Sequence, residues 1–119
     1  MFDVTVNAFV DHDLELAYHV EPLEQVVDDI AYFAKKNHIK RVKKDKSHIK
    51  RSFAYAEILN DLERISDHCS NIATNIIQSI NSSLPKHILK NKLKEADTGD
   101  FKGQVEEFRA KYAVDPINL

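Results

Sequence analysis

The stretch EILNDLERISDHCSNIATNII, residues 57–77, decides the fold, because its pattern is that of one long helix. Apolar residues recur at alternating steps of four and three, which places them along one side of a helix. The members of this predicted seam are Ile58, Leu62, Ile65, Cys69, Ile72 and Ile76. We expect a helix that buries this seam and continues to about residue 81.

The same stretch carries two acidic pairs at i, i+4 spacing, Glu57 with Asp61 and Glu63 with Asp67. Two carboxylates one helical turn apart repel each other unless a positive charge lies between them. Glu63 and Asp67 are predicted on the flank of the seam, within reach of solvent. This second pair is the first indication of a cation site.

Length and composition point to one helical domain. The chain has 119 residues, of which 43% are hydrophobic and 30% are charged, as in globular proteins. With 2 Gly and 3 Pro it lacks the turn residues that an all-β fold needs. The single Cys excludes an internal disulfide, and no apolar run is long enough to span a bilayer.

Charge is segregated along the chain. Residues 1–34 hold eight acids and no Lys or Arg, whereas residues 35–51 hold nine bases and one acid, Asp45. The nine bases are Lys35, Lys36, Lys40, Arg41, Lys43, Lys44, Lys46, Lys50 and Arg51. Such a basic segment could meet phosphate, anionic headgroups or nucleic acid, or be the solvated end of a helix. It lacks the interleaved aromatic residues expected of a single-strand binder, and we expect no nucleic-acid partner.

Residues 2–10 alternate apolar and polar side chains, yet no partner strand is visible, so we interpret them as the last turns of a helix. Asp11 or Asp13 then caps the next helix.

A second long helix is predicted from about residue 13 to 44. Pro22 either kinks this helix or opens a new one after Glu21. Its seam is Leu16, Val20, Leu23, Val27, Ile30 and Ala34.

Residues 45–48 form a short turn, which makes the two long helices antiparallel neighbours. Asp45 or Ser47 is the expected cap of the later helix.

Two shorter helices are predicted at 86–96 and 101–112. The last one carries a stripe of Phe101, Val105, Phe108 and Tyr112. The prediction is therefore a single all-α domain over residues 1–119, with a core at 13–82 and a helical extension at 85–112. Two long helices and part of a third cannot bury both seams, so we expect an upstream helix or self-association, as in a homo-oligomer.

A carboxylate metal site is the main chemical hypothesis. Glu24 and Asp28 also lie at i, i+4 on the second helix, and antiparallel packing could bring them to Glu63 and Asp67. Four carboxylates suit iron, manganese, magnesium or calcium better than zinc. The same spacing is also common on solvated helix faces.

His19 and His68 are conceivable ligands, although a lone helical His more often has a structural role. Neither Glu24 nor Glu63 is followed by a His three residues later, which weakens a redox di-iron interpretation. Cys69 is expected to be a buried structural thiol. Arg64 is expected to pair on the surface with Asp61 or Asn60.

The sequence DLERISDHCSNIATNII, residues 61–77, resembles the signature of the PhoU family, D-L-E-R-I-[GS]-D-H-x-x-N-I-A. The matching residues are Asp61, Leu62, Glu63, Arg64, Ile65, Asp67, His68, Asn71, Ile72 and Ala73. The His-Cys-Ser-Asn sequence at residues 68–71 is similar to that of the PhoU-like domain at the C-terminal end of bacterial sodium/phosphate cotransporter-family proteins. The stretches AYHVEPLEQVVDDI and FRAKYAV also look similar to that subgroup.

The resemblance implies an antiparallel three-helix bundle, here with a truncated first helix. It implies iron or another divalent metal at Glu24, Asp28, Glu63 and Asp67. The groups expected beside the metal are Asp61, Arg64, His68 and Asn71. PhoU proteins normally repeat the bundle twice, so the single copy here suggests either one module of a larger transporter or a bundle completed by another chain.

The function implied is non-catalytic regulation of sodium-dependent phosphate uptake, at the inner face of the plasma membrane. The partner would be a transmembrane transporter domain, in the same polypeptide or another. One alternative is a free-standing metal-binding bundle for phosphate signalling. Another is a metal-dependent phosphohydrolase, against which stands the lack of a motif that places a general base.

Overall fold

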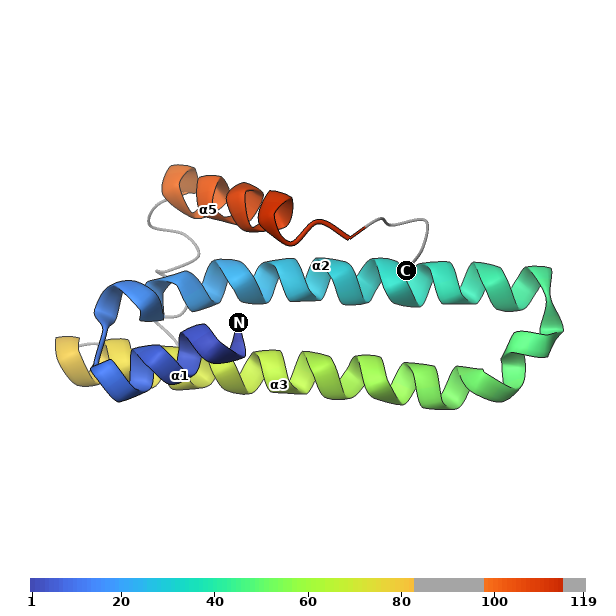
Figure 1. Cartoon of the computed structure of the whole chain (residues 1–119), viewed down its shortest axis with the longest axis horizontal. Helices are drawn as coiled ribbons and strands as arrows, with labels where there is room; N and C mark the ends of the chain where they lie inside the picture. Colours follow the sequence, from blue (N-terminus) through green and yellow to red (C-terminus); the bar gives the residue numbers. More distant parts are fainter. Residues whose placement is uncertain (83–97, 115–119) are drawn as a thin grey trace.

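The computed structural model of the protein describes residues 1–82 and 98–114, and every regular element in those ranges is helical. The elements are α1 (Phe2–Asp11), α2 (Leu14–Lys44), a short 3-10 helix η1 (Lys46–His48), α3 (Ile49–Asn81) and α5 (Thr98–Lys111). α2 and α3 form a long antiparallel hairpin, α1 lies along one half of α3, and α5 lies along α2 (Figure 1). The molecule measures 53 × 26 × 24 Å. The predicted all-α bundle with a short first helix is confirmed.

A tight corner joins α1 to α2. His12 adopts the left-handed conformation, with φ at 52°, and ends α1. The side chain of Asp13 accepts a 3.1 Å hydrogen bond from the backbone N–H of Leu16 and caps α2. The prediction that residues 2–10 are helical is confirmed. Of the two candidate caps, Asp11 and Asp13, it is Asp13 that caps α2.

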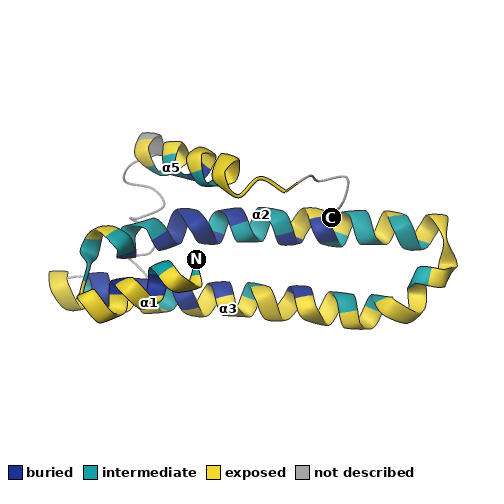
Figure 2. Ribbon diagram, viewed as in Figure 1, coloured by how far each residue is buried: buried dark blue, intermediate teal, exposed yellow. Residues whose placement is uncertain are grey.

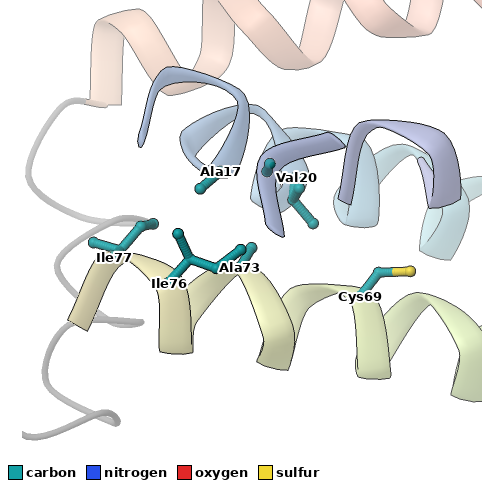
Figure 3. Close-up of a cluster of buried hydrophobic side chains, with 7 residues drawn as sticks. Ala17, Val20, Cys69, Ala73, Ile76 and Ile77 are labelled. Carbon is teal, nitrogen blue, oxygen red and sulfur yellow. The ribbon is translucent and has the colours of Figure 1, made fainter. Parts of the chain in front are cut away.

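Helix α2 runs without interruption through Pro22, so the alternative in which Pro22 opens a new helix after Glu21 is wrong. The predicted seam of α2 is largely confirmed: Val20, Leu23 and Ala34 are buried, and its other members are half-buried. The core lies where α1, α2 and α3 meet (Figure 3). It consists of Ala8, Ala17, Val20, Cys69, Ala73, Ile76 and Ile77. Cys69 is buried, as expected.

The predicted seam of α3 is wrong over most of its length. Four of its six residues are exposed: Ile58 at 58%, Leu62 at 50%, Ile65 at 51% and Ile72 at 41%. The buried residues of α3 are Leu59, Ser66, Cys69, Ser70, Ala73, Thr74, Ile76 and Ile77. Most of them directly follow a seam residue, so the buried face is rotated by about 100°. Figure 2 shows that buried positions on α3 concentrate on the half beside α1.

The reason for this rotation is the length of α1 and the chemistry of α3. Helix α1 begins beside Ser66, whose hydroxyl lies 3.2 Å from the sulfur of Met1, so it leaves the earlier turns of α3 uncovered. The buried residues of α3 include the small side chains Ser66, Ser70, Ala73 and Thr74, which let a neighbouring helix approach closely.

The turn between the long helices is built on Asp45. Its side chain accepts a 2.9 Å hydrogen bond from the backbone N–H of Ser47 and caps η1. This hydrogen bond, with further contributions from the Ser47 hydroxyl and His48, lowers the pKa of Asp45. The expectation that Asp45 or Ser47 caps α3 itself is therefore wrong, since α3 begins after η1 without a side-chain cap.

Helix α5 packs on the side of α2 that faces away from α3. Val105 is buried, and the rings of Phe108 and His19 meet edge to face at 5.8 Å. Arg109 Nη2 lies 2.5 Å from Asp29 Oδ2, and this contact raises the pKa of Arg109. The helix predicted at 86–96 lies outside the described residues.

Candidate functional site

The acidic pair Glu63 and Asp67 is neutralised in part by a base of the same chain. The Lys35 ammonium forms an ion pair with the Glu63 carboxylate across the α2–α3 interface. Both side chains are roughly one-third exposed, so the contact lies at the edge of the hairpin. The positive charge expected near the acidic pair is thus Lys35.

The four predicted metal ligands do not converge. Glu24 is buried, Asp28 is half-buried, and Asp67 is exposed on the outer side of α3. Across residues 1–82 and 98–114, no three His, Cys, Asp or Glu side chains are grouped so that they could hold a metal ion. The donor set as arranged here does not fit a metal, and the four-carboxylate site stays a prediction.

The residues predicted beside the metal are also spread over the surface of α3. Arg64 Nη1 lies 3.5 Å from Asp61 Oδ1, which confirms the expected surface pair. His68 is exposed and Asn71 is half-buried. His19, the other candidate ligand, packs against the aromatic ring of Phe108 instead.

A buried polar contact that the sequence did not predict joins α2 to α3. Ser70 Oγ donates a 2.7 Å hydrogen bond to Glu21 Oε2, and Thr74 Oγ1 donates a 2.8 Å hydrogen bond to the backbone carbonyl of Ser70. Glu21 is 3% exposed and Ser70 is fully buried. The available signal was the i, i+4 repeat of small hydroxyl residues, Ser66, Ser70 and Thr74, beside the apolar seam.

An exposed apolar stripe runs along the outer side of α3. Three of its members lie on the turns of α3 that α1 does not reach, namely Ile58, Leu62 and Ile65. Beyond them the stripe enters a groove of about 310 Å³ between α1 and α3. The groove is lined by Phe9, His12, Ile72, Asn75, Ile76, Ser79 and Ile80. Contiguous exposed apolar surface of this kind marks interaction sites in soluble domains.

The predicted basic segment lies at the far end of the hairpin. Lys35 is occupied by Glu63, while Lys36 lies over the ring of Tyr32 and Arg41 over that of Tyr55, each 5.8 Å from the ring centroid. The remaining bases of the segment are exposed, namely Lys40, Lys43, Lys44, Lys46, Lys50 and Arg51.

The family model for the PhoU domain matches residues 1–76, which include α1, α2 and most of α3. The chain belongs to the PhoU family. The match covers the DLERISDH stretch on which the resemblance rested.

A curated relative of this PhoU domain is the phosphate-specific transport system accessory protein PhoU homolog 1 of Thermotoga maritima. It is 27% identical over 71 residues, which are 60% of this chain and 31% of the relative. The chain thus spans less than a third of the length of that protein. No solved structure matches the chain. Within the described residues, no helix is both long and apolar enough to cross a membrane.

Proposed function

We propose that this PhoU domain is a non-catalytic regulator of phosphate uptake that works by docking on a phosphate transporter. The observation that carries the proposal is the exposed apolar stripe of α3. Membership of the PhoU family and the accessory role printed in the name of its relative support the link to phosphate transport.

The stripe has the properties of a docking surface. Ile58, Leu62 and Ile65 are each about half-exposed and lie on the same side of one helix, and Leu62 and Ile65 belong to the DLERISDH stretch. Covering large apolar side chains with a partner lowers the free energy by about 25 cal/mol per Å² of apolar area removed from water. The Asp61–Arg64 pair beside the stripe supplies a polar rim.

The proposed partner is the membrane domain of a sodium-dependent phosphate cotransporter, in the same polypeptide or another, at the inner face of the plasma membrane. The sequence His68-Cys69-Ser70-Asn71, which resembles that of the cotransporter-linked PhoU domains, supports this choice of partner. A second copy of the chain is the alternative occupant of the stripe, and it would make the domain a homo-oligomer.

Phosphate uptake in cells that produce this protein tests the proposal. Deletion of the gene is expected to change the rate of uptake under phosphate-rich conditions, and the wild-type gene should restore it. Leu62→Glu should fail to restore regulation because it places a charge in the stripe. Asn60→Glu is the matched control, since Asn60 is exposed on the opposite side of the same helix. Normal regulation with Leu62→Glu would overturn the proposal.

A metal-dependent phosphohydrolase is the alternative function, although no three His, Cys, Asp or Glu side chains of the described residues are grouped to hold its metal. Turnover of a phosphomonoester by the purified chain with added Mn²⁺ or Fe²⁺ would favour it. Our proposal expects no turnover above that of the free metal ion.

A further inference from the structure

The end of the α2–α3 hairpin, residues 39–53 and here called the hairpin tip, concentrates positive charge. It contains seven Lys and Arg residues and one acid, Asp45. Six of the bases are exposed, namely Lys40, Lys43, Lys44, Lys46, Lys50 and Arg51. The carboxylate of Asp45 is committed to capping η1. Across residues 1–82 and 98–114, none of these six bases forms an ion pair, so within these ranges the tip presents positive charge that no acid neutralises.

The hairpin tip also exposes large apolar side chains. Phe53 is 84% exposed, more than any other large apolar residue in the described ranges, and Ile39 and Ile49 are 56% and 45% exposed. Ile49 and Phe53 lie one turn apart on α3 and share a side of the helix. Ile39 lies one turn beyond Lys35, whose ammonium reaches across to Glu63 of α3, so it points to the edge where the two helices meet.

The position of the tip leaves it free to touch a surface. It lies at the opposite end of the molecule from the α1–α2 corner, and neither α1 nor α5 covers it (Figure 1). The groove between α1 and α3 is at the other end of the hairpin, so one partner at the tip would not compete with another at the groove.

We infer that the hairpin tip docks on an anionic lipid bilayer, with its lysines at the headgroups and Phe53, Ile39 and Ile49 in the interfacial layer. Basic clusters are attracted to anionic lipids, and exposed apolar side chains add burial in the acyl boundary. Nucleic acid would satisfy the lysines, but exposed Ile and Phe side chains gain nothing from a phosphate backbone. The inference rests on the proposed function for its cellular setting and specifies which surface faces the membrane.

Vesicle binding by the purified chain tests this inference without a transporter. The chain should bind vesicles of phosphatidylcholine with phosphatidylglycerol, bind vesicles of phosphatidylcholine alone far more weakly, and dissociate as salt rises. Neutralising three bases with Lys43→Gln, Lys44→Gln and Lys46→Gln should lower the partition coefficient by roughly 100-fold. Stronger binding to duplex DNA or RNA than to the anionic vesicles would overturn the inference.

A single tryptophan reports on insertion, because the chain contains no Trp. Phe53→Trp should show a blue-shifted emission when anionic vesicles are added. Phe2→Trp, at an exposed site on α1, should show no shift and serves as the control. Equal shifts at both sites, or no shift at Phe53→Trp in a variant whose helical content is normal, would contradict docking by the tip. Because uptake is a separate readout, failure here leaves the regulatory proposal intact, and the converse also holds.

Discussion

Ser70 Oγ donates a 2.7 Å hydrogen bond to Glu21 Oε2 at a site where both residues are buried, and this contact ties α3 to α2. Burial of a carboxylate in a region of low dielectric is costly unless hydrogen bonds compensate. The contact therefore helps to fix which face of α3 meets α2, and thereby which face stays exposed.

Ser70→Ala should lower the free energy of unfolding by about 1–3 kcal/mol, because it removes a hydrogen bond from a buried carboxylate. Urea titration followed by circular dichroism measures the change. Ser79→Ala is the control, since Ser79 is exposed and donates a 2.7 Å hydrogen bond to the backbone carbonyl of Ile76 in its own helix. Equal losses in the two variants would mean that the Glu21–Ser70 contact contributes nothing of its own.

The rotated face of α3 is tested by two isoleucines of the same helix. Ile77→Ala should cost about 2–5 kcal/mol of unfolding free energy, as for a fully buried aliphatic side chain. Ile65→Ala should cost less than about 1 kcal/mol, because Ile65 is 51% exposed. The originally predicted seam requires the larger loss at Ile65, so the order of the two losses decides between the faces.

Stability should fall below neutral pH in part through His38. Partial burial, followed by the positive charges of Arg41 and His48, lowers the pKa of His38 from its ordinary value of 6.5. A base with a lowered folded-state pKa is protonated more readily in the unfolded chain, so its contribution is complete above pH 6.5 and declines as pH falls toward the folded-state pKa. His38 Nε2 also lies 2.9 Å from Ser52 Oγ, and the centroids of the His38 and Tyr55 rings are 4.5 Å apart. Replacing His38 removes these contacts as well, so the slope of stability against pH is compared rather than stability at one pH.

Unfolding free energies measured between pH 7 and pH 5 test this dependence. His38→Gln should flatten the decline, whereas His68→Gln, at an exposed residue of α3, serves as the control. A decline of the same steepness in all three proteins would exclude His38 as a contributor.

Metal binding is tested by elemental analysis of protein purified without chelator. Glu63→Gln combined with Asp67→Asn should lower any bound metal if the family-type acidic pair holds it. Lys35→Met should raise affinity for Mn²⁺ by up to about fivefold, because it frees the Glu63 carboxylate from a partly exposed ion pair. Unchanged metal content in both variants would show that these carboxylates hold no metal.

Periodicity predicted which segments are helical but not which face of each helix is buried. On α2 the seam around Val20 and Leu23 is the buried face, because α3, α1 and α5 surround that helix. On α3, α1 reaches only to Ser66, so the apolar residues Ile58, Leu62 and Ile65 stay exposed on the turns before it. The Glu21–Ser70 contact depends on the relative rotation of two helices, which a one-dimensional pattern does not specify.

For the candidate site, too, the sequence predicted which residues matter but not which residues they contact. The spacing of Glu63 and Asp67 correctly indicated a need for nearby positive charge, yet the sequence could not show that Lys35 supplies it. Glu24 is buried on α2 whereas Asp67 is exposed on α3, so equal spacing of two acidic pairs did not predict the environment of each carboxylate.

The central claim is that the exposed stripe of α3 contacts a phosphate transporter, and site-specific photo-crosslinking in cells tests it most directly. A photoreactive residue at position 62 should form an adduct with a phosphate-transporting membrane protein, identified by mass spectrometry, while the same residue at position 60 should not. An adduct at position 62 with a second copy of this chain alone, or identical adducts from both positions, would contradict the claim.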